Sequence, residues 1–138
     1  LNIAREIGLL NMLQKLLSPL LRFLFPDLRD DPEALGYIAA NITINVFGLG
    51  SAATPSGLKA MECMQRHNPD KKTASRAMVT FLVLNTAGVT ILSTTIVSLR
   101  AQFGALNPTD FMPLAIIATS CASIGGLALD RWVNYRGK

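Results

Sequence analysis

The sequence predicts an all-α membrane protein with an interfacial amphipathic helix, a broken or re-entrant helical hairpin and two transmembrane helices. Half of the 138 residues are hydrophobic and only 16% are charged, against about 25% in soluble domains. The charges leave three uncharged runs, at 34–58, 77–99 and 111–129. Each run is close to the roughly 20 residues that a membrane span needs. Lys and Arg gather in the blocks that border these runs, as in membrane proteins.

The first element, Leu1–Phe25, has leucines at helical spacing. It also carries four charged residues: Arg5, Glu6, Lys15 and Arg22. Such frequent charge disfavours a full span and favours an amphipathic helix in the membrane interface. The alternative is a core helix of a soluble bundle. We expect Pro19 to kink the helix and Pro26 to end it.

The central segment is predicted to be a broken hairpin, consisting of helix 34–47, an irregular tip 48–54 and helix 55–65. Four residues interrupt the uncharged run here: Gly48, Gly50, Pro55 and Gly57. Glycine permits turns and proline removes a backbone donor, so a continuous helix should break. Thr54 is typical of an N-cap, with Pro55 as the first helical residue. Asp31 and Pro32 are expected to start the first helix in the same way.

Polar side chains accompany this break. Asn41 and Asn45 are four residues apart and therefore share one helix face. Ser51 and Thr54 add hydroxyls near the tip. One interpretation is a polar site or gate inside the membrane, because a broken helix directs free N–H groups into the gap. The other is a glycine-rich packing contact whose polar side chains bond between helices.

The run 77–99 is long enough to span but contains Asn85, Thr86 and Gly88 in its middle. We predict a second, partly unwound segment here, with Asn85 and Thr86 lining a site together with Asn45 and Ser51. Interhelical hydrogen bonding by Ser and Thr, without a site, is the alternative, and it is favoured for Ser93 and Ser98.

The run 111–129 is predicted to span the membrane. Ala118, Ala122 and Gly126 recur every fourth position and would let another helix approach closely. Trp132 and Tyr135 follow, where an interfacial aromatic belt is expected. The loop 65–76 and the C-terminal tail are rich in Lys and Arg, so both are predicted to be cytoplasmic.

Several function classes are disfavoured. No Ser/His/Asp set, metal-ligand spacing, phosphate-binding loop or pair of acids on one helix face occurs, so we expect neither an enzyme nor a bound metal or cofactor. Nucleic acid is not an expected partner, because aromatic residues are scarce and the basic residues flank apolar runs. His67, the single histidine, is expected to be an ordinary loop residue.

Three strings carry a family resemblance: GLGSAATPSGLKAM from Gly48, FLVLNTAGVT from Phe81 and NPTDF from Asn107. With the segments around them, from about Ile7 to Arg136, they make the chain similar to the spore maturation protein A family. That family carries the nucleoside-recognition, or Gate, domain. It usually has Asn at the position of Ser51 and Pro at that of Ser93, which bears on local backbone detail.

The resemblance implies an integral, multi-pass protein of the inner (cytoplasmic) membrane, often paired with or fused to spore maturation protein B. The Gate domain is distantly similar to part of the concentrative nucleoside transporters, in which a re-entrant hairpin tip and a partly unwound helix form the substrate site. By position, the tip would be Gly48–Gly57 and the unwound helix would centre on Asn85–Gly88. This chain offers Ser51 and Thr54 where the transporter tip offers Gln and Glu.

Residues 1–138 are therefore expected to form one Gate domain, in a chain that lacks its N-terminal segment. The predicted function is a transport or gating subunit for a small polar solute such as a nucleoside. Its expected partners are the lipid bilayer and either a B-type protein or further copies of itself. The alternative is a structural membrane scaffold without a solute site. The candidate binding or gating residues are Asn41, Asn45, Gly48, Gly50, Ser51, Thr54, Pro55, Asn85, Thr86 and Gly88.

Overall fold

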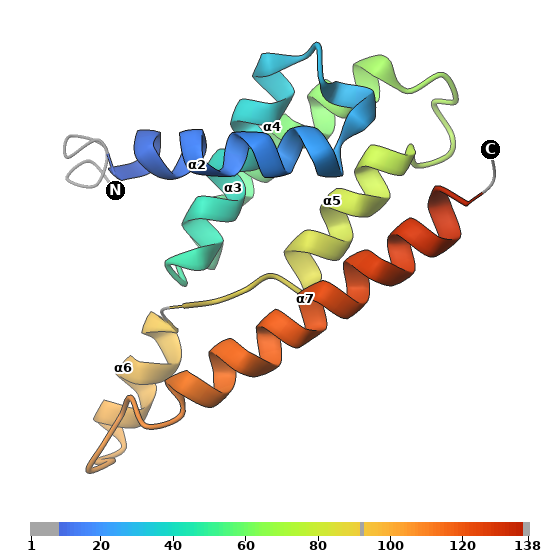
Figure 1. Ribbon diagram of the computed structural model, residues 1–138. Coiled ribbons are helices and arrows are strands. Elements are labelled where there is room, and N and C mark those ends of the chain that lie inside the picture. The colour runs from blue at the N-terminus through green and yellow to red at the C-terminus, as the bar shows by residue number, and fades with distance from the viewer. Residues whose placement is uncertain (1–8, 92, 137–138) are drawn as a thin grey trace.

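The computed structural model describes residues 9–91 and 93–136, which are helical apart from turns and short connecting segments. The elements in chain order are α2 (Leu9–Leu24), the 3₁₀ turn η1 (Pro26–Leu28), α3 (Pro32–Val46), α4 (Gly50–His67), α5 (Arg76–Thr86), α6 (Thr94–Gln102) and α7 (Met112–Asn134) (Figure 1). The predicted all-α class is confirmed over these residues. The first eight residues of the predicted interfacial helix lie outside them.

Two helix pairs form the body of the molecule. α3 packs along α4, α5 packs along α7, and α2 lies across the α3–α4 hairpin (Figure 1). Figure 1 also shows α6 beside the N-terminal end of α7, at the opposite end from the polar loops. The buried core lies where α2, η1, α3, α4 and α5 meet. Its largest members are Leu21, Phe25, Ile38, Met64 and Phe81.

α2 is amphipathic, as predicted. It turns Leu21 and Leu24 into the core and keeps charged Arg22 exposed. Three large apolar side chains also remain on its outer surface: Leu16, Leu20 and Phe23. Pro19 lies inside α2, and the helix ends just before Pro26, in agreement with the predicted stop.

The entry to the α3–α4 hairpin is capped as predicted. The Asp31 carboxylate accepts a hydrogen bond from the Ala34 N–H at 2.9 Å, and Pro32 occupies the first helical position. The prediction of His67 as an ordinary loop residue is wrong. His67 is the last residue of α4, and its Nε2 lies 2.8 Å from Oδ2 of Asp31. This contact joins the end of α4 to the start of α3.

The predicted tip 48–54 is too long, and Pro55 does not start the second helix. α3 ends at Val46 and α4 begins at Gly50. Gly48 has a φ of 68°, a left-handed conformation that glycine adopts without strain. Because the chain reverses here within three residues, Pro55 falls inside α4, where its missing N–H leaves the Ser51 carbonyl without its helical donor.

The run 77–99 is interrupted, as its central polar residues suggested. α5 has 11 residues and α6 has 9, and the backbone between them is not helical at residues 87–91 and 93. The N–H of Ile91 donates to the Val46 carbonyl at 3.1 Å, so this segment bonds to the end of α3 instead of continuing α5. Two continuous transmembrane helices are therefore not found in the described residues.

Among the residues that the structure describes, α7 is the one helix long and apolar enough to cross a membrane. Its 23 residues are mostly exposed. A Cβ built on Gly126 would lie 3.1 Å from Val83 of α5, so the small residue allows the close approach predicted for this stripe. Ala118 and Ala122, further along the stripe, are exposed.

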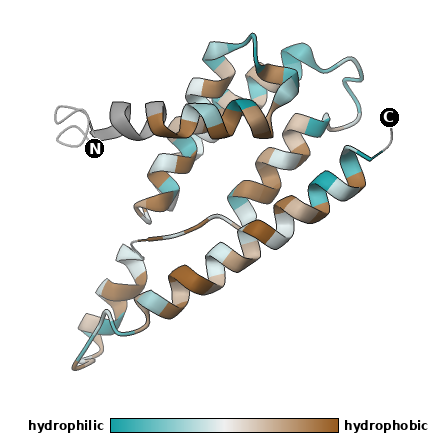
Figure 2. Ribbon diagram, viewed as in Figure 1, coloured by the Kyte–Doolittle hydropathy of each residue, from teal (hydrophilic) through white to brown (hydrophobic). Residues whose placement is uncertain are grey.

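Charged and polar residues gather at one end of the molecule. Figure 2 shows hydrophilic colour at the turn before α3, at the loop between α4 and α5 and at the C-terminal end of α7. The loop between α6 and α7 lies at the opposite end (Figure 1). Loop 65–76 and the C-terminal tail therefore share one side, as the predicted topology requires.

Candidate functional site

Three asparagines of two helices, α3 and α5, form a chain of side-chain amides. The Asn45 amide nitrogen donates to Oδ1 of Asn41 at 3.2 Å and to Oδ1 of Asn85 at 2.9 Å. Asn41 and Asn45 meet because they are one helical turn apart on α3. Asn85 reaches them from the last turn of α5.

The chain is anchored to backbone at both ends. Asn41, 4% exposed, donates to the Ala53 carbonyl of α4 at 2.9 Å, and Asn85 donates to the Phe81 carbonyl at 3.0 Å. Gly57 makes the first anchor possible, because a Cβ there would lie 2.9 Å from the Asn41 amide nitrogen. Sequence reasoning did not assign this role to Gly57.

These bonds leave one acceptor available in the middle of the chain. A carboxamide has two N–H donors and one carbonyl acceptor. Asn45 uses both donors on Asn41 and Asn85, and its own Oδ1 makes no hydrogen bond with the described residues. Both partners therefore hold the Asn45 carboxamide in place, and its carbonyl can accept a hydrogen bond from a ligand.

Two cavities meet at this chain. One, of about 340 Å³, is lined by Asn45, Gly48, Asn85, Gly88, Thr90, Ser93, Thr95 and Ile96. The other, of about 240 Å³, is mostly apolar, with leucines of α2, Leu84 and Leu127 on its walls. Asn45, Asn85 and Gly88 line both cavities. The amide pair thus forms part of the wall between a polar cavity and an apolar one.

Hydrogen bonds join the two helix breaks beside the polar cavity. The Thr94 hydroxyl donates to the Gly48 carbonyl at 3.1 Å. The Ile91 N–H donates to the Val46 carbonyl, so the segment after α5 bonds to the end of α3 at two points. Ser123 of α7 donates to the carbonyl of Ala87. Three backbone carbonyls at the breaks, those of Val46, Gly48 and Ala87, are therefore paired with neighbouring segments.

The structure brings together half of the predicted site residues. Those at the amide chain or the polar cavity are Asn41, Asn45, Gly48, Asn85 and Gly88. Gly50 is the first residue of α4. The rest have exposed side chains and line neither cavity: Ser51, Thr54, Pro55 and Thr86. α4 is already helical at Ser51, Thr54 and Pro55, so these three residues are exposed on a helix instead of lying in an irregular tip, and Thr86 is the exposed last residue of α5.

Other cavity residues were missed or undervalued by sequence reasoning. Ser93 lines the polar cavity, although interhelical packing was favoured for it. Thr90 and Thr95 also line this cavity. The sequence feature that could have indicated them is the high frequency of Ser and Thr after Gly88. Ser123 gave no such signal, because only the packing of α7 on α5 brings it to the break.

The lining of the polar cavity is uncharged. Carboxamides, hydroxyls and backbone groups can bind a neutral polar ligand through several donors and acceptors. The part of the chain that the structure describes has no cluster of His, Cys, Asp or Glu that would hold a metal ion. The uncharged donors and acceptors of the lining therefore fit an uncharged polar ligand.

One curated protein resembles the whole chain. Spore maturation protein A of Bacillus subtilis (strain 168) is 42% identical over 138 residues, which is all of this chain and 70% of that protein. No protein-family model matches the chain, and no solved structure matches it.

Proposed function

The chain belongs to the spore maturation protein A family, and from that premise we propose that it is a membrane transport or gating subunit for a small, uncharged polar solute. The observation that carries the proposal is the Asn45–Asn85 bond, which lies between a polar and an apolar cavity. The hydroxyls of Ser93 and Thr95 and the free acceptor of Asn45 would bind the solute.

Opening this wall would require little energy. One neutral side-chain hydrogen bond contributes about 0.5–1.5 kcal/mol net. A solute that accepts from the Asn45 amide N–H and donates to the Asn85 carboxamide oxygen would replace the bond between them. The cavity, at about 340 Å³, lies at the lower end of the sizes usual for small-molecule sites. A nucleoside is one solute of this chemical class.

In this proposal the protein crosses the inner (cytoplasmic) membrane several times. α7 would span it, α3 and α4 would enter and return as a re-entrant hairpin, and α5 and α6 would form an interrupted span. Transporters commonly place such broken helices at their substrate sites. A B-type protein or a second copy would cover exposed apolar surface, and the subunit would not be an enzyme.

A structural scaffold remains the second candidate function. The observation that favours it is the anchoring of the amide chain to the Ala53 and Phe81 carbonyls. Such a chain locks α3, α4 and α5 together whether or not a solute binds. A test must therefore separate solute contact from helix locking.

The experiment uses the full-length protein with its B-type partner in proteoliposomes, and measures uptake of labelled nucleosides and other neutral polar solutes. Ser93→Ala removes a cavity hydroxyl without touching the amide chain, and exposed Ser98→Ala on α6 is the matched control. Transport predicts reduced uptake for Ser93→Ala, normal uptake for Ser98→Ala and unchanged unfolding temperatures for both. Absence of uptake for every solute, with the assembly intact, would favour the scaffold.

A further inference from the structure

We propose that Arg76, Arg131 and Tyr135 bind the phosphate of an anionic phospholipid at the C-terminal end of α7. The inference rests on α7 crossing a bilayer, as proposed above, and is independent of solute transport. Arg76 is the first residue of α5 and Arg131 and Tyr135 lie at the C-terminal end of α7, whereas Asn85 of the amide chain lies in the last turn of α5.

Two guanidinium groups lie close to the Tyr135 ring. The Arg131 guanidinium carbon lies 4.4 Å from the ring centroid, and that of Arg76 lies 5.7 Å from it. Arg131 also lies 5.1 Å from the ring of Phe23 and donates to the Phe23 carbonyl. The two positively charged guanidinium groups therefore lie next to aromatic rings, at distances typical of cation–π contacts.

Neither arginine has a carboxylate partner among the described residues. The ion pairs within 4 Å in that part of the chain use other cations: Lys59, Arg66, His67 and Arg100. Asp130 is adjacent to Arg131 in the chain, but it is 5% exposed and its oxygens accept from Thr80 and Asn134. The two guanidinium groups therefore keep donors for an external anion, and guanidinium forks match phosphate oxygens well.

Tyr135 adds a third donor. Its hydroxyl oxygen is buried and has no hydrogen-bond partner among the described residues. An unpaired buried hydroxyl is unfavourable. A phosphate oxygen bound at the arginines would accept a hydrogen bond from this hydroxyl and satisfy the group.

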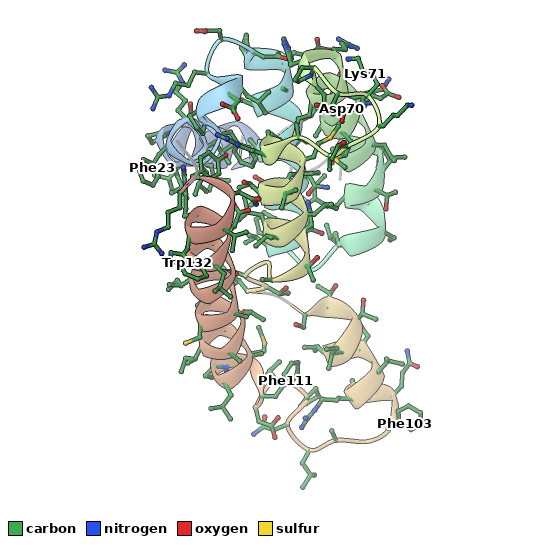
Figure 3. All side chains as sticks on the ribbon, turned by 90° about the vertical axis from the view of Figure 1, so that its right-hand side faces the viewer. Phe23, Asp70, Lys71, Phe103, Phe111 and Trp132 are labelled. Carbon is green, nitrogen blue, oxygen red and sulfur yellow. The ribbon has the colours of Figure 1, made fainter. Side chains whose placement is uncertain are left out.

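The surroundings favour a lipid over a free phosphate ion. Trp132 is 59% exposed and Phe23 is 67% exposed, beside exposed Leu129 and Val133. Figure 3 shows Phe23 and Trp132 at the same end of α7. Exposed aromatic residues at the end of a span are typical of the headgroup region. A headgroup phosphate at the arginines would place its acyl chains along these apolar side chains.

The test measures lipid retention by the purified full-length protein in mixed micelles of phosphatidylglycerol and phosphatidylcholine, by native mass spectrometry. Arg131→Gln and Arg76→Gln should each lower the preference for phosphatidylglycerol about fivefold, the effect of one basic residue near a membrane surface. Arg66→Gln removes the same charge on the same side of the molecule, from an arginine paired with Glu33, and should keep the preference. Tyr135→Phe keeps the ring and should cause a smaller loss.

If Arg131→Gln and Arg66→Gln showed the same preference for phosphatidylglycerol over phosphatidylcholine, the proposal would be overturned. Competition by inorganic phosphate as strong as by phosphatidylglycerol would also overturn it, since the site would then be one for a soluble anion. Unfolding temperatures in phosphatidylcholine alone show whether each variant is folded, and Tyr135→Phe provides a second readout if an arginine variant is not. Loss of solute uptake with lipid preference retained would separate this site from the proposed transport function.

Discussion

The amide nitrogen of Asn45 lies 2.9 Å from the carboxamide oxygen of Asn85, although the two residues are 40 positions apart. This bond ties the last turn of α3 to the last turn of α5, next to both helix breaks. Asn45 is the donor and bonds to two acceptors at once. The network therefore depends on a donor group at this position, which leads to the first prediction.

Asn45→Asp should destabilise the protein by about 2 kcal/mol or more, because it sets a carboxylate against two amide oxygens in a partly buried site. The shape of the side chain hardly changes, so the effect reports the lost donors. Thermal unfolding in detergent measures it. Asn107→Asp, at an exposed residue, should leave the unfolding temperature nearly unchanged. Equal unfolding temperatures for the two variants would contradict the amide chain.

Gly57→Ala should destabilise the hairpin by about 1–3 kcal/mol, the usual cost of overpacking. The added methyl would lie 2.9 Å from the Asn41 amide nitrogen and push it away from the Ala53 carbonyl. Gly36→Ala, in the neighbouring helix, meets no atom within 4 Å and should stabilise by about 1 kcal/mol through helix propensity. Gly57→Ala should lower the unfolding temperature and Gly36→Ala should raise it. A higher unfolding temperature in both variants would refute the close contact at Gly57.

Thr80→Val should cost about 1–3 kcal/mol of stability. The Thr80 hydroxyl donates to buried Asp130 at 2.6 Å, and valine would leave that carboxylate with one donor fewer. Thr43→Val is a control of the same shape, because the buried Thr43 hydroxyl has no partner within the described residues. That control should be neutral or stabilising in equilibrium unfolding. A similar loss in both would mean that the Thr80–Asp130 bond contributes nothing.

The Asp31 carboxylate should make stability depend on acid pH. The backbone N–H of Ala34, with a smaller contribution from His67, holds the pKa of Asp31 below its ordinary value of 3.8. A carboxyl with a lowered pKa in the folded state stabilises it above the unfolded pKa. This stabilisation is lost as pH falls through the folded value.

Asp31→Asn keeps an N-cap but removes the charge, so its unfolding temperature should fall less steeply below about pH 4 than that of the unmodified protein. Asp27→Asn, in the same turn and exposed, should keep the full dependence. Unfolding temperatures measured from pH 7 to the acid limit of folding provide the comparison. Parallel curves for Asp31→Asn and the unmodified protein would exclude the contribution of Asp31.

Local patterns in the sequence predicted most helices and both interruptions. Uncharged runs located α3, α5 and α7, and Asp31 with Pro32 correctly located the start of α3. The tip was misplaced because two glycines and a proline are each compatible with a turn. Only the left-handed backbone at Gly48 selects which of them makes it.

Within the site, sequence alone determined that Asn41 and Asn45 share a face, because a helical turn of 3.6 residues brings positions four apart together. The tertiary structure decided that Asn85 completes the chain, that Ser123 bonds the break and that Ser51 and Thr54 point away from both cavities. The physical reason is the range of each interaction. Helical period is a local property of the chain, whereas contacts between residues 36 or 40 positions apart depend on how the helices pack and rotate against one another.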